Sequence, residues 1–335
     1  MPSLQLDSLA ERAFAPVAAA IAAERIPGGV LGLVTRDGER VTRFAGAAQV
    51  VPERRALTAG TYFDLASLTK VMFTTPRILA LAEAGRIDLD APLISVMPDF
   101  RQYSADAWER TLTFRQCLGH QTPLPGVEPL YTYGQAPDTL RAFVLQREWR
   151  QGPAVYSDIN FILLGIVLER LEGRMIRDFP LPAGLSFKPD PANSAATENC
   201  TWRGRVMVGE VHDENCYALK GSGHAGLFGT IDGVLDFARG LLHGSGASAG
   251  AIALMREPLS EKRTHGWERP YSGWSGGDNC GTGVIGHTGF TGTGLWLDFD
   301  RGLAWSLLTN RVHPSRHSDS GIVALRRAVG DIVNS

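Results

Sequence analysis

Patterns typical of β-strands lie near the two ends of this chain and are sparse over residues 87–155. Near the N-terminus, residues 30–35 and 40–45 flank Asp37-Gly38, a dipeptide that favours a hairpin turn. Near the C-terminus the hydrophobic period changes to two, and three more strands are predicted, at residues 282–287, 294–299 and 303–309. These five segments predict one antiparallel sheet of five strands, built from both ends of the chain.

Helical patterns flank the predicted strands at both ends. The first helix places Leu9, Phe14, Val17 and Ile21 at helical spacing, and the last places Ile322, Leu325, Val329 and Ile332 on one face. We therefore predict an α/β fold with two domains and an active site between them. Residues 1–86 and 275–335 form a discontinuous sheet domain flanked by the terminal helices, and residues 87–274 form a mainly helical insert.

Several features are predicted within this outline. A helix that begins near Ser67 runs to about Ala84, with a kink or break near Thr75 because Pro76 lies inside it. A second helix follows a cap at Ser157 or Asp158 and stops at Gly173. Further helices are predicted near residues 231–242 and 251–255, and long connections with little regular structure at residues 180–225.

The composition is that of an ordinary globular protein. The chain has 335 residues and a formal net charge of −2, which allows a large core in one or two joined domains. No run of like charges indicates a nucleic-acid or membrane surface, and short arginine pairs such as Arg326-Arg327 are predicted to be solvated. No apolar run approaches the roughly 20 residues of a membrane span.

The cysteines and the N-terminal segment bear on the compartment. The four cysteines, at positions 117, 200, 216 and 280, form no C-x-x-C pair, which predicts free thiols in a reducing compartment. Residues 13–23 are apolar, but Asp7, Glu11 and Arg12 precede them, so an amphipathic helix is predicted rather than a signal peptide. We expect a cytoplasmic protein, and a periplasmic location stays open as the alternative.

Ser67 and Lys70 stand three residues apart at the start of an apolar helical run. On a helix they share a face, so the hydroxyl and the amine can touch. A lysine accepts the serine proton only when desolvation or nearby positive charge lowers its pKa, and the apolar residues 71–73 favour such a shift. A helix cap beside a solvated lysine is the alternative interpretation.

A nucleophilic serine also needs a second acid or base, an oxyanion hole and a substrate anchor. Tyr156 stands just before a predicted helix, and a charged lysine nearby would lower the pKa of its phenol. Residues 287–292 close a strand with little side-chain bulk, so an extended peptide or acyl group can lie along it. The backbone N–H groups of Ser67 and Phe290 are the predicted oxyanion hole. A core tyrosine and a glycine-rich turn without a ligand are the alternatives.

Together these motifs resemble those of a known family. Ser67-x-x-Lys70, Tyr156-Ser157-Asp158 and His287-Thr288-Gly289 are similar to the motifs of class C serine β-lactamases, D-alanyl-D-alanine carboxypeptidases and esterases. The phrases at residues 160–165 and 223–228 also look like this superfamily. The resemblance covers nearly the whole chain and implies a β-lactamase/DD-peptidase-like fold. It further implies acyl-enzyme chemistry with Ser67, Lys70 and Tyr156 as catalytic residues and no metal or organic cofactor.

Two departures bear on the substrate. Asp158, His287, Thr288 and Gly289 are the predicted substrate-binding residues, but β-lactamases of this type usually have asparagine and lysine at the first two positions. Histidine, with a reference pKa near 6.5, anchors a carboxylate only partly at neutral pH. The His-Thr-Gly motif and residues 209–215 instead resemble N-acetylmuramyl-L-alanine amidases and carboxypeptidase-like proteins of peptidoglycan turnover.

The predicted function is therefore hydrolysis of an amide or ester, in a peptidoglycan-derived peptide, a muropeptide or a small ester. β-Lactam hydrolysis is one alternative, and a non-catalytic muropeptide-binding or sensor protein is another. The predicted partner is a small molecule or short peptide, without nucleic acid or membrane, and the oligomeric state is left open. His212, Asp213 and His224 are candidate metal ligands, but a capping role for Asp213 and a cleft-lining role for His224 are favoured.

Overall fold

The computed structural model describes residues 3–335. Its helices are α1 (Leu4–Ala22), α2 (Thr75–Glu83), α3 (Phe114–Leu118), α4 (Pro137–Gln146), α5 (Asp158–Glu172), α6 (Glu214–Ala218), α7 (Ile231–His243), α8 (Ala249–Arg256) and α9 (Ile322–Val333). Its strands are β1 (Gly28–Thr35), β2 (Arg40–Gln49), β3 (Arg55–Ala56), β4 (Phe63–Asp64), β5 (Leu185–Ser186), β6 (Ala196–Cys200), β7 (Arg205–Val208), β8 (Phe228–Gly229), β9 (Val284–Thr288), β10 (Gly294–Asp298) and β11 (Leu303–Thr309).

The main sheet is antiparallel and has the strand order β3-β2-β1-β11-β10-β9. The five predicted strands are present, and β1 pairs with β11, so the two ends of the chain do meet in one sheet. A short sixth strand, β3, was not predicted. Strand β1 also begins two residues before the predicted position, because Gly28 and Gly29 pair with β2 instead of interrupting the strand. A Cβ at Gly28 would lie only 2.7 Å from the Ala47 carbonyl oxygen.

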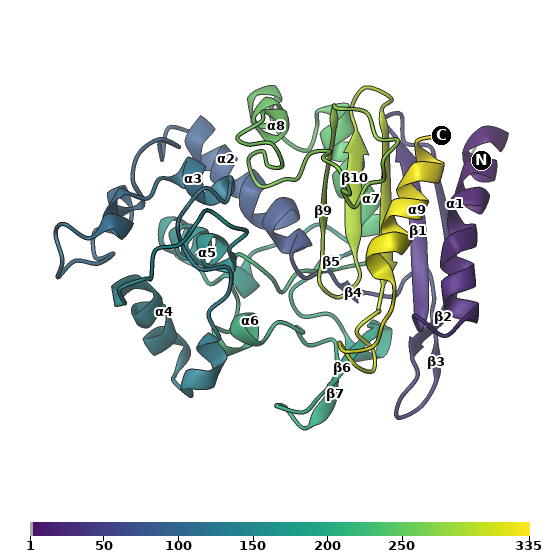
Figure 1. Ribbon diagram of the computed structural model, residues 1–335, viewed down its shortest axis with the longest axis horizontal. Coiled ribbons are helices and arrows are strands. Elements are labelled where there is room, and N and C mark those ends of the chain that lie inside the picture. The colour runs from purple at the N-terminus through teal and green to yellow at the C-terminus, as the bar shows by residue number, and fades with distance from the viewer. Residues whose placement is uncertain (1–2) are drawn as a thin grey trace.

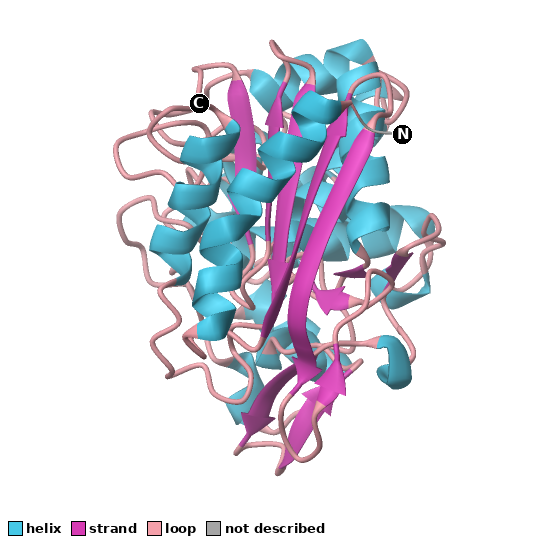
Figure 2. Ribbon diagram, turned by 90° about the vertical axis from the view of Figure 1, so that its right-hand side faces the viewer, coloured by secondary structure: helices cyan, strands magenta, loops and turns pink. Residues whose placement is uncertain are grey.

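Helices cover both faces of this sheet. Figures 1 and 2 show α1 and α9 side by side on one face, and α7 lies against the other. The alternation along β1 explains this, because Leu31 and Leu33 pack with α1 and α9 whereas Val30 and Val34 belong to the core shared with α7. Both sets are buried, which is why β1 is apolar at nearly every position.

Two helices predicted around the candidate site residues are present, the one that follows Ser67 and helix α5. The helix changes geometry before Pro76, with a π-helical turn at Lys70–Thr74 that continues directly into α2, so a change near Thr75 is present but not a break. Proline lacks the N–H that an α-helix would need there, and a π-helical turn accommodates the loss. Helix α5 begins at Asp158 after Ser157 and ends before Gly173 in the left-handed conformation, as predicted.

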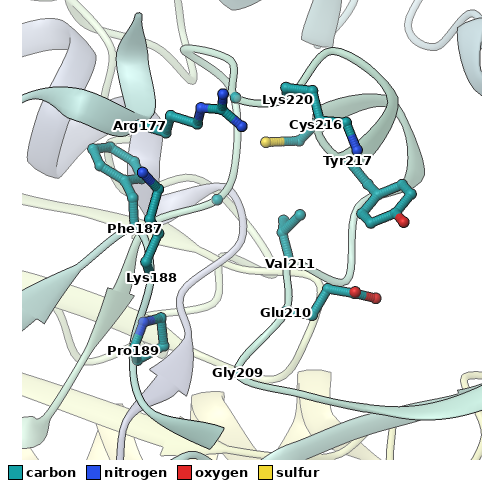
Figure 3. A pocket seen from close by; sticks show the side chains of 12 residues that line it. Arg177, Phe187, Lys188, Pro189, Gly209, Glu210, Val211, Cys216, Tyr217 and Lys220 are labelled. Carbon is teal, nitrogen blue, oxygen red and sulfur yellow. The ribbon is translucent and has the colours of Figure 1, made fainter.

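Residues 180–225 contain more regular structure than predicted. Strands β6 and β7 form a hairpin, and Asp213 caps the short helix α6 by accepting from the Cys216 N–H. These elements are too short to show a hydrophobic period in the sequence. A cavity of about 310 Å³ opens beside them, lined by Arg177, Phe187, Lys188, Pro189, Gly209, Glu210, Val211, Cys216, Tyr217, Lys220, Gly221 and Gly226 (Figure 3).

Among the helices of residues 3–335, none combines the length and apolar character that a bilayer crossing requires.

Candidate active site

Ser67 lies where strand β4 gives way to the helix that carries Lys70. The residue before it, Ala66, has a φ of 47°, a left-handed conformation that is uncommon for residues other than glycine and tends to occur at functional sites. The Ala66 N–H donates to Asp64 Oδ1 at 2.8 Å, which fixes this bend. Ser67 is half-buried, and Lys70 Nζ donates to its Oγ at 2.9 Å. The spacing of three residues therefore brings the two side chains into contact.

Lys70 is completely buried and its ammonium group is fully paired. Besides Ser67 Oγ, Nζ lies 3.0 Å from the His224 carbonyl oxygen and 2.8 Å from Asp158 Oδ1. Two of these contacts are hydrogen bonds and the third, with Asp158, is an ion pair, so three oxygens surround the ammonium nitrogen within 3.0 Å. The side chain is thus held as a cation between the nucleophile and a carboxylate.

The expectation of a lowered lysine pKa was wrong. Burial is the largest influence and lowers the pKa of Lys70, but the carboxylate charge of Asp158 and the hydrogen bonds of Asp158 and Tyr156 outweigh it and the net pKa is raised. The sequence shows the apolar residues next to Lys70. It does not show that Asp158, the first residue of helix α5, lies beside the ammonium group. Lys70 in the resting site is therefore an ammonium ion.

Tyr156 lies against the same two side chains. Its hydroxyl interacts with both Lys70 and Ser67, and Lys70 Nζ lies 5.1 Å from the centre of its ring. The expected lowering of the phenol pKa was also wrong, because burial raises the pKa of Tyr156 more than Lys70 lowers it and Asp158 raises it further. His120 stacks on this tyrosine with 4.4 Å between ring centres. Its Nδ1 accepts the Ser157 N–H at 3.1 Å and so holds the start of α5 in place.

His287 faces Tyr156 from strand β9, with 5.9 Å between ring centres. Its Nδ1 lies 2.9 Å from the Thr288 carbonyl oxygen, and because a carbonyl only accepts, this nitrogen carries the proton. Nε2 is then a bare acceptor, and within residues 3–335 it has no hydrogen-bond partner. Burial, with help from Arg263 and Lys70, holds the pKa of His287 well below its usual value. His287 is therefore a neutral acceptor at neutral pH.

Acid should destabilise the protein through its buried histidines. Burial also lowers the pKa of His120, so below about pH 6.5 the unfolded chain binds a proton that the folded chain does not. Stability is then lost as the pH falls. We expect His120→Asn to reduce the drop in unfolding free energy between pH 7.5 and 5.5 by about 1.4 kcal/mol. Asparagine tolerates the φ of 52° at this position.

Urea denaturation at the two pH values measures this effect. His317→Asn is the matched control, because His317 is exposed in the folded chain and should leave the pH dependence unchanged. Equal pH dependence in wild type and His120→Asn would contradict a buried neutral His120.

The turn after β9 is fastened to the Ser67 segment. Thr291 Oγ1 donates to the Asp64 carbonyl oxygen at 2.6 Å, and Thr293 Oγ1 donates to that of Leu65 at 3.1 Å. A Cβ at Gly289 would collide with the Leu65 carbonyl oxygen and with Thr293 Oγ1, so only glycine allows this approach. The turn that carries Phe290 thus lies directly beside the residues that precede Ser67.

Arg326 of helix α9 also binds the turn that follows β9. Its Nη2 donates to the carbonyl oxygens of Gly289 and Thr293, both at 2.7 Å. Arg326 is only 7% exposed, and burial lowers its pKa to about 9, so the prediction of a solvated Arg326-Arg327 pair was wrong for Arg326.

The predicted oxyanion donors are both available. Among residues 3–335, neither the Ser67 N–H nor the Phe290 N–H donates to a protein acceptor, whereas the Gly289 N–H donates to the Thr293 carbonyl oxygen. The Phe290 side chain is 51% exposed and stacks on His212 with 5.6 Å between ring centres. Thr288 is the last residue of β9 and is half-buried beside this turn.

Two glycines allow the loop that carries the His224 carbonyl to lie directly against helix α5. A Cβ at Gly165 would lie 2.5 Å from the Gly223 nitrogen, and one at Gly223 would lie 2.5 Å from the Phe161 carbonyl oxygen. Thr74 Oγ1 also donates to the Gly223 carbonyl oxygen at 2.6 Å. These contacts explain the two glycine-containing phrases in the sequence, because they place the His224 carbonyl at Lys70.

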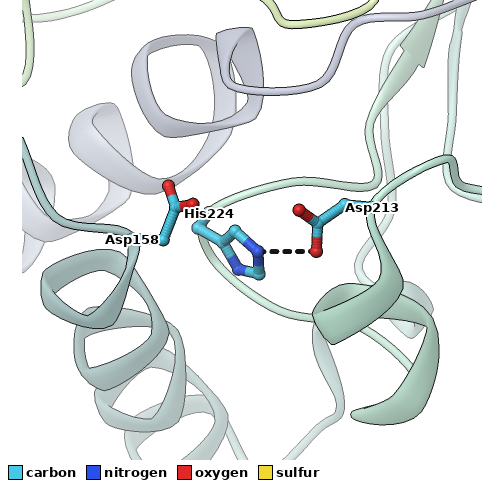
Figure 4. Close-up of side chains that lie close together, drawn as sticks. All are labelled: Asp158, Asp213 and His224. Atoms are coloured by element: carbon cyan, nitrogen blue, oxygen red, sulfur yellow. Dashed lines mark hydrogen bonds and ion pairs between the residues drawn. The ribbon is translucent and has the colours of Figure 1, made fainter. Parts of the chain in front are cut away.

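Asp158, Asp213 and His224 place potential metal-ligating atoms within 4.8 Å of one another (Figure 4). Their atoms already have partners, because Asp213 Oδ1 lies 2.9 Å from His224 Nε2 and Asp158 is paired with Lys70. Within this group the Lys70 ammonium is the counter-ion of Asp158, and the His224 ring pairs with Asp213. The third residue proposed from sequence, His212, pairs instead with Glu198 at 3.2 Å.

Arg263 is a site residue that sequence reasoning missed. Its guanidinium lies 5.0 Å from the centre of the Tyr156 ring and is paired with Glu268 at 3.1 Å. It is the second-largest influence, after burial, that lowers the pKa values of His120 and His287. Arg263 stands in a loop without a recognisable motif, so no sequence signal marked it.

The sequence of this chain is similar to those of several known proteins. A sequence model of the family described as Beta-lactamase matches residues 12–328. The N-acetylmuramyl-L-alanine amidase of Bacillus subtilis (strain 168) is 29% identical, over 86% of this chain and 78% of that protein. A putative D-alanyl-D-alanine carboxypeptidase of Escherichia coli (strain K12) is 27% identical, over 84% and 78% of the two chains.

A solved structure has the same fold. EstCE1, described as a hydrolase with promiscuous acyltransferase activity, superposes with a TM-score of 0.77 at 20% identity. The superposition covers 99% of this chain and 100% of that one.

Proposed function

The chain belongs to the beta-lactamase family, whose members are serine acyl-transfer hydrolases, and we propose that Ser67 is the nucleophile with which it cleaves an amide or ester bond. The observation that carries this proposal is the 2.9 Å contact between Lys70 Nζ and Ser67 Oγ. The unpaired N–H groups of Ser67 and Phe290 support it, because they can bind a developing oxyanion.

In the proposed mechanism, Ser67 Oγ attacks the carbonyl carbon of the substrate. Lys70 and Tyr156 are the proposed acid/base pair through which the hydroxyl proton leaves Oγ, and the tetrahedral oxyanion lies between the two N–H groups. The pair returns a proton to the leaving group as the bond to it breaks. Water then hydrolyses the acyl-enzyme and restores Ser67.

We propose a substrate derived from peptidoglycan, of the amidase or carboxypeptidase type, with a small ester as a further possibility. The names of the two curated relatives support the first class. The state of His287 limits which part of such a substrate can lie at this position, because a bare nitrogen acceptor repels a carboxylate and favours a group with an N–H or O–H donor. Asp158, Thr288 and Gly289 remain proposed substrate-binding residues.

Two measurements test this function. A fluorophosphonate should label Ser67 stoichiometrically, whereas a binding or sensor protein with an inactive site would stay unlabelled. Hydrolysis should then be compared for a p-nitrophenyl ester, a chromogenic cephalosporin, a D-alanyl-D-alanine peptide and N-acetylmuramyl-L-alanine. The ranking of kcat/KM identifies the substrate class, and a dominant cephalosporin rate would favour the β-lactamase alternative.

A charge at position 287 should change this ranking. In His287→Lys, a permanent cation replaces the neutral acceptor and can pair with the carboxylate of a cephalosporin. We expect kcat/KM for the cephalosporin to rise about tenfold relative to the ester, the lower range of a hydrogen bond to a charged group. His287→Gln is the control, since it changes shape without adding charge. Equal substrate ratios in the lysine and glutamine variants would contradict a role for charge here.

A further inference from the structure

The Lys70 ammonium cannot accept the Ser67 proton as it stands. Its Nζ lies within 3.0 Å of three oxygens, Ser67 Oγ, the His224 carbonyl oxygen and Asp158 Oδ1, and the Tyr156 hydroxyl also interacts with it. A nitrogen with three hydrogens and one carbon has no lone pair, so it must release one proton before it takes another. Of these neighbours, the carbonyl oxygen is far too weak a base, Ser67 is the donor, and Tyr156 is a neutral phenol because burial raises its pKa. Asp158 is the remaining acceptor.

We propose that Asp158 is the terminal proton acceptor of the acylation step, and that it forms a Ser67–Lys70–Asp158 relay. This inference rests on Ser67 being the nucleophile, and it assigns Asp158 a part in proton transfer beyond substrate binding. Asp158 Oδ1 lies 2.8 Å from Lys70 Nζ, and apart from this ion pair it has no hydrogen-bond donor within residues 3–335. Its side chain is 17% exposed, so water competes little for the proton.

The step balances without any further reactant. The Oγ–H bond of Ser67 breaks as the bond from Oγ to the acyl carbon forms and the carbonyl π pair moves to the oxygen. Lys70 passes one of its protons to Asp158 Oδ1 and takes the proton of Ser67. Lys70 therefore leaves the step as the ammonium that entered it, and Asp158 leaves as a carboxylic acid. The proton returns through Lys70 and Tyr156 when the leaving group departs.

The other titratable groups around the pair are poorer acceptors. Burial raises the pKa of Tyr156, so the phenol keeps its proton at neutral pH. Asp213 is held by His224 at 2.9 Å and by the Cys216 N–H at 2.7 Å, and its carboxylate makes no hydrogen bond with Lys70. On the side of Tyr156 lie the cation Arg263 and the neutral histidines His120 and His287. Both ring nitrogens of His224 are engaged, by Ser222 and Asp213.

The rate at which a fluorophosphonate labels Ser67 tests the relay. Asp158→Asn keeps the size of the side chain but removes the basic oxygen, so labelling at pH 7 should slow about 100-fold. The pKa of Lys70 falls once its counter-charge is gone. The variant should therefore regain rate as the pH rises from 7 to 10, because a free amine then becomes available. Asp158→Glu, which restores a carboxylate, should lie between the two.

The opposite outcome is equally well defined. Asp158 raises the pKa of Tyr156. If the phenol were the terminal base, Asp158→Asn would therefore leave the labelling rate at pH 7 unchanged or make it faster. That result would overturn the relay. Absence of labelling in the wild type would instead refute Ser67 as the nucleophile, so the two failures are distinguishable.

Two comparisons complete the test. Asp213→Asn makes the same chemical change in the neighbouring carboxylate, keeps a good helix cap for α6 and should leave the shape of the pH profile unchanged. The wild-type profile is informative even if a variant fails to fold. The relay predicts a nearly flat rate between pH 6 and 9, whereas a requirement for free Lys70 amine would make the rate climb about tenfold per pH unit.

Discussion

Replacing Ser67 with alanine should reduce turnover by about 10⁴-fold or more, because it removes the proposed nucleophile, the hydroxyl that Lys70 Nζ contacts. The residual rate over water would come from binding and from the N–H groups alone. The fold should survive, since Ser67 is half-buried and its hydroxyl accepts one hydrogen bond from Lys70 Nζ. Loss of one such hydrogen bond costs about 1 kcal/mol.

Steady-state kinetics with the best substrate of the screen, together with a thermal unfolding curve, measures both effects. Ser104→Ala is the matched control, because Ser104 is exposed in a loop and its hydroxyl takes no part in the site. Turnover that survives in Ser67→Ala at a native melting temperature would refute the acyl-enzyme mechanism.

Features that depend on local spacing were predictable from the sequence. The i, i+3 relation of Ser67 and Lys70 placed the two side chains on one face, and their atoms do lie 2.9 Å apart. The period-two segments gave the main strands for a similar reason, since alternation is a local property of a strand. Strand β3 has two residues and shows no such alternation.

Charge states were not predictable, because they depend on partners that are distant in the chain. Asp158 and Lys70 were each recognised, but nothing in the sequence states that they form an ion pair at 2.8 Å. That one contact reverses the expected direction of the lysine pKa. Arg326 is a similar case, because a charged residue beside the apolar stripe of a helix is normally solvated. Here the carbonyl oxygens of Gly289 and Thr293 both accept from its Nη2 in the protein interior.

Replacing Gly289 with alanine should lower kcat by about 10²- to 10³-fold, the usual cost of losing one oxyanion donor. The new Cβ would collide with the backbone carbonyl of Leu65, which cannot move aside as a flexible side chain would. The turn must then retreat from the segment that precedes Ser67, and it takes the Phe290 N–H with it. Because the donor acts mainly on the transition state, kcat should fall far more than KM rises.

Gly281→Ala is the matched control for this substitution. Gly281 precedes strand β9, and Gly289 follows it. A Cβ at Gly281 meets no atom within 4 Å, so activity and stability should be unchanged. Overpacking at Gly289 should also cost about 1–3 kcal/mol of stability, which a urea titration of both variants measures. A loss of stability with wild-type kcat would show that the turn moves without affecting catalysis, and Phe290 would then no longer qualify as an oxyanion donor. Both variants add the same methyl group. A fall in kcat confined to Gly289→Ala would therefore show that catalysis depends on the close contact between this turn and the Leu65 carbonyl.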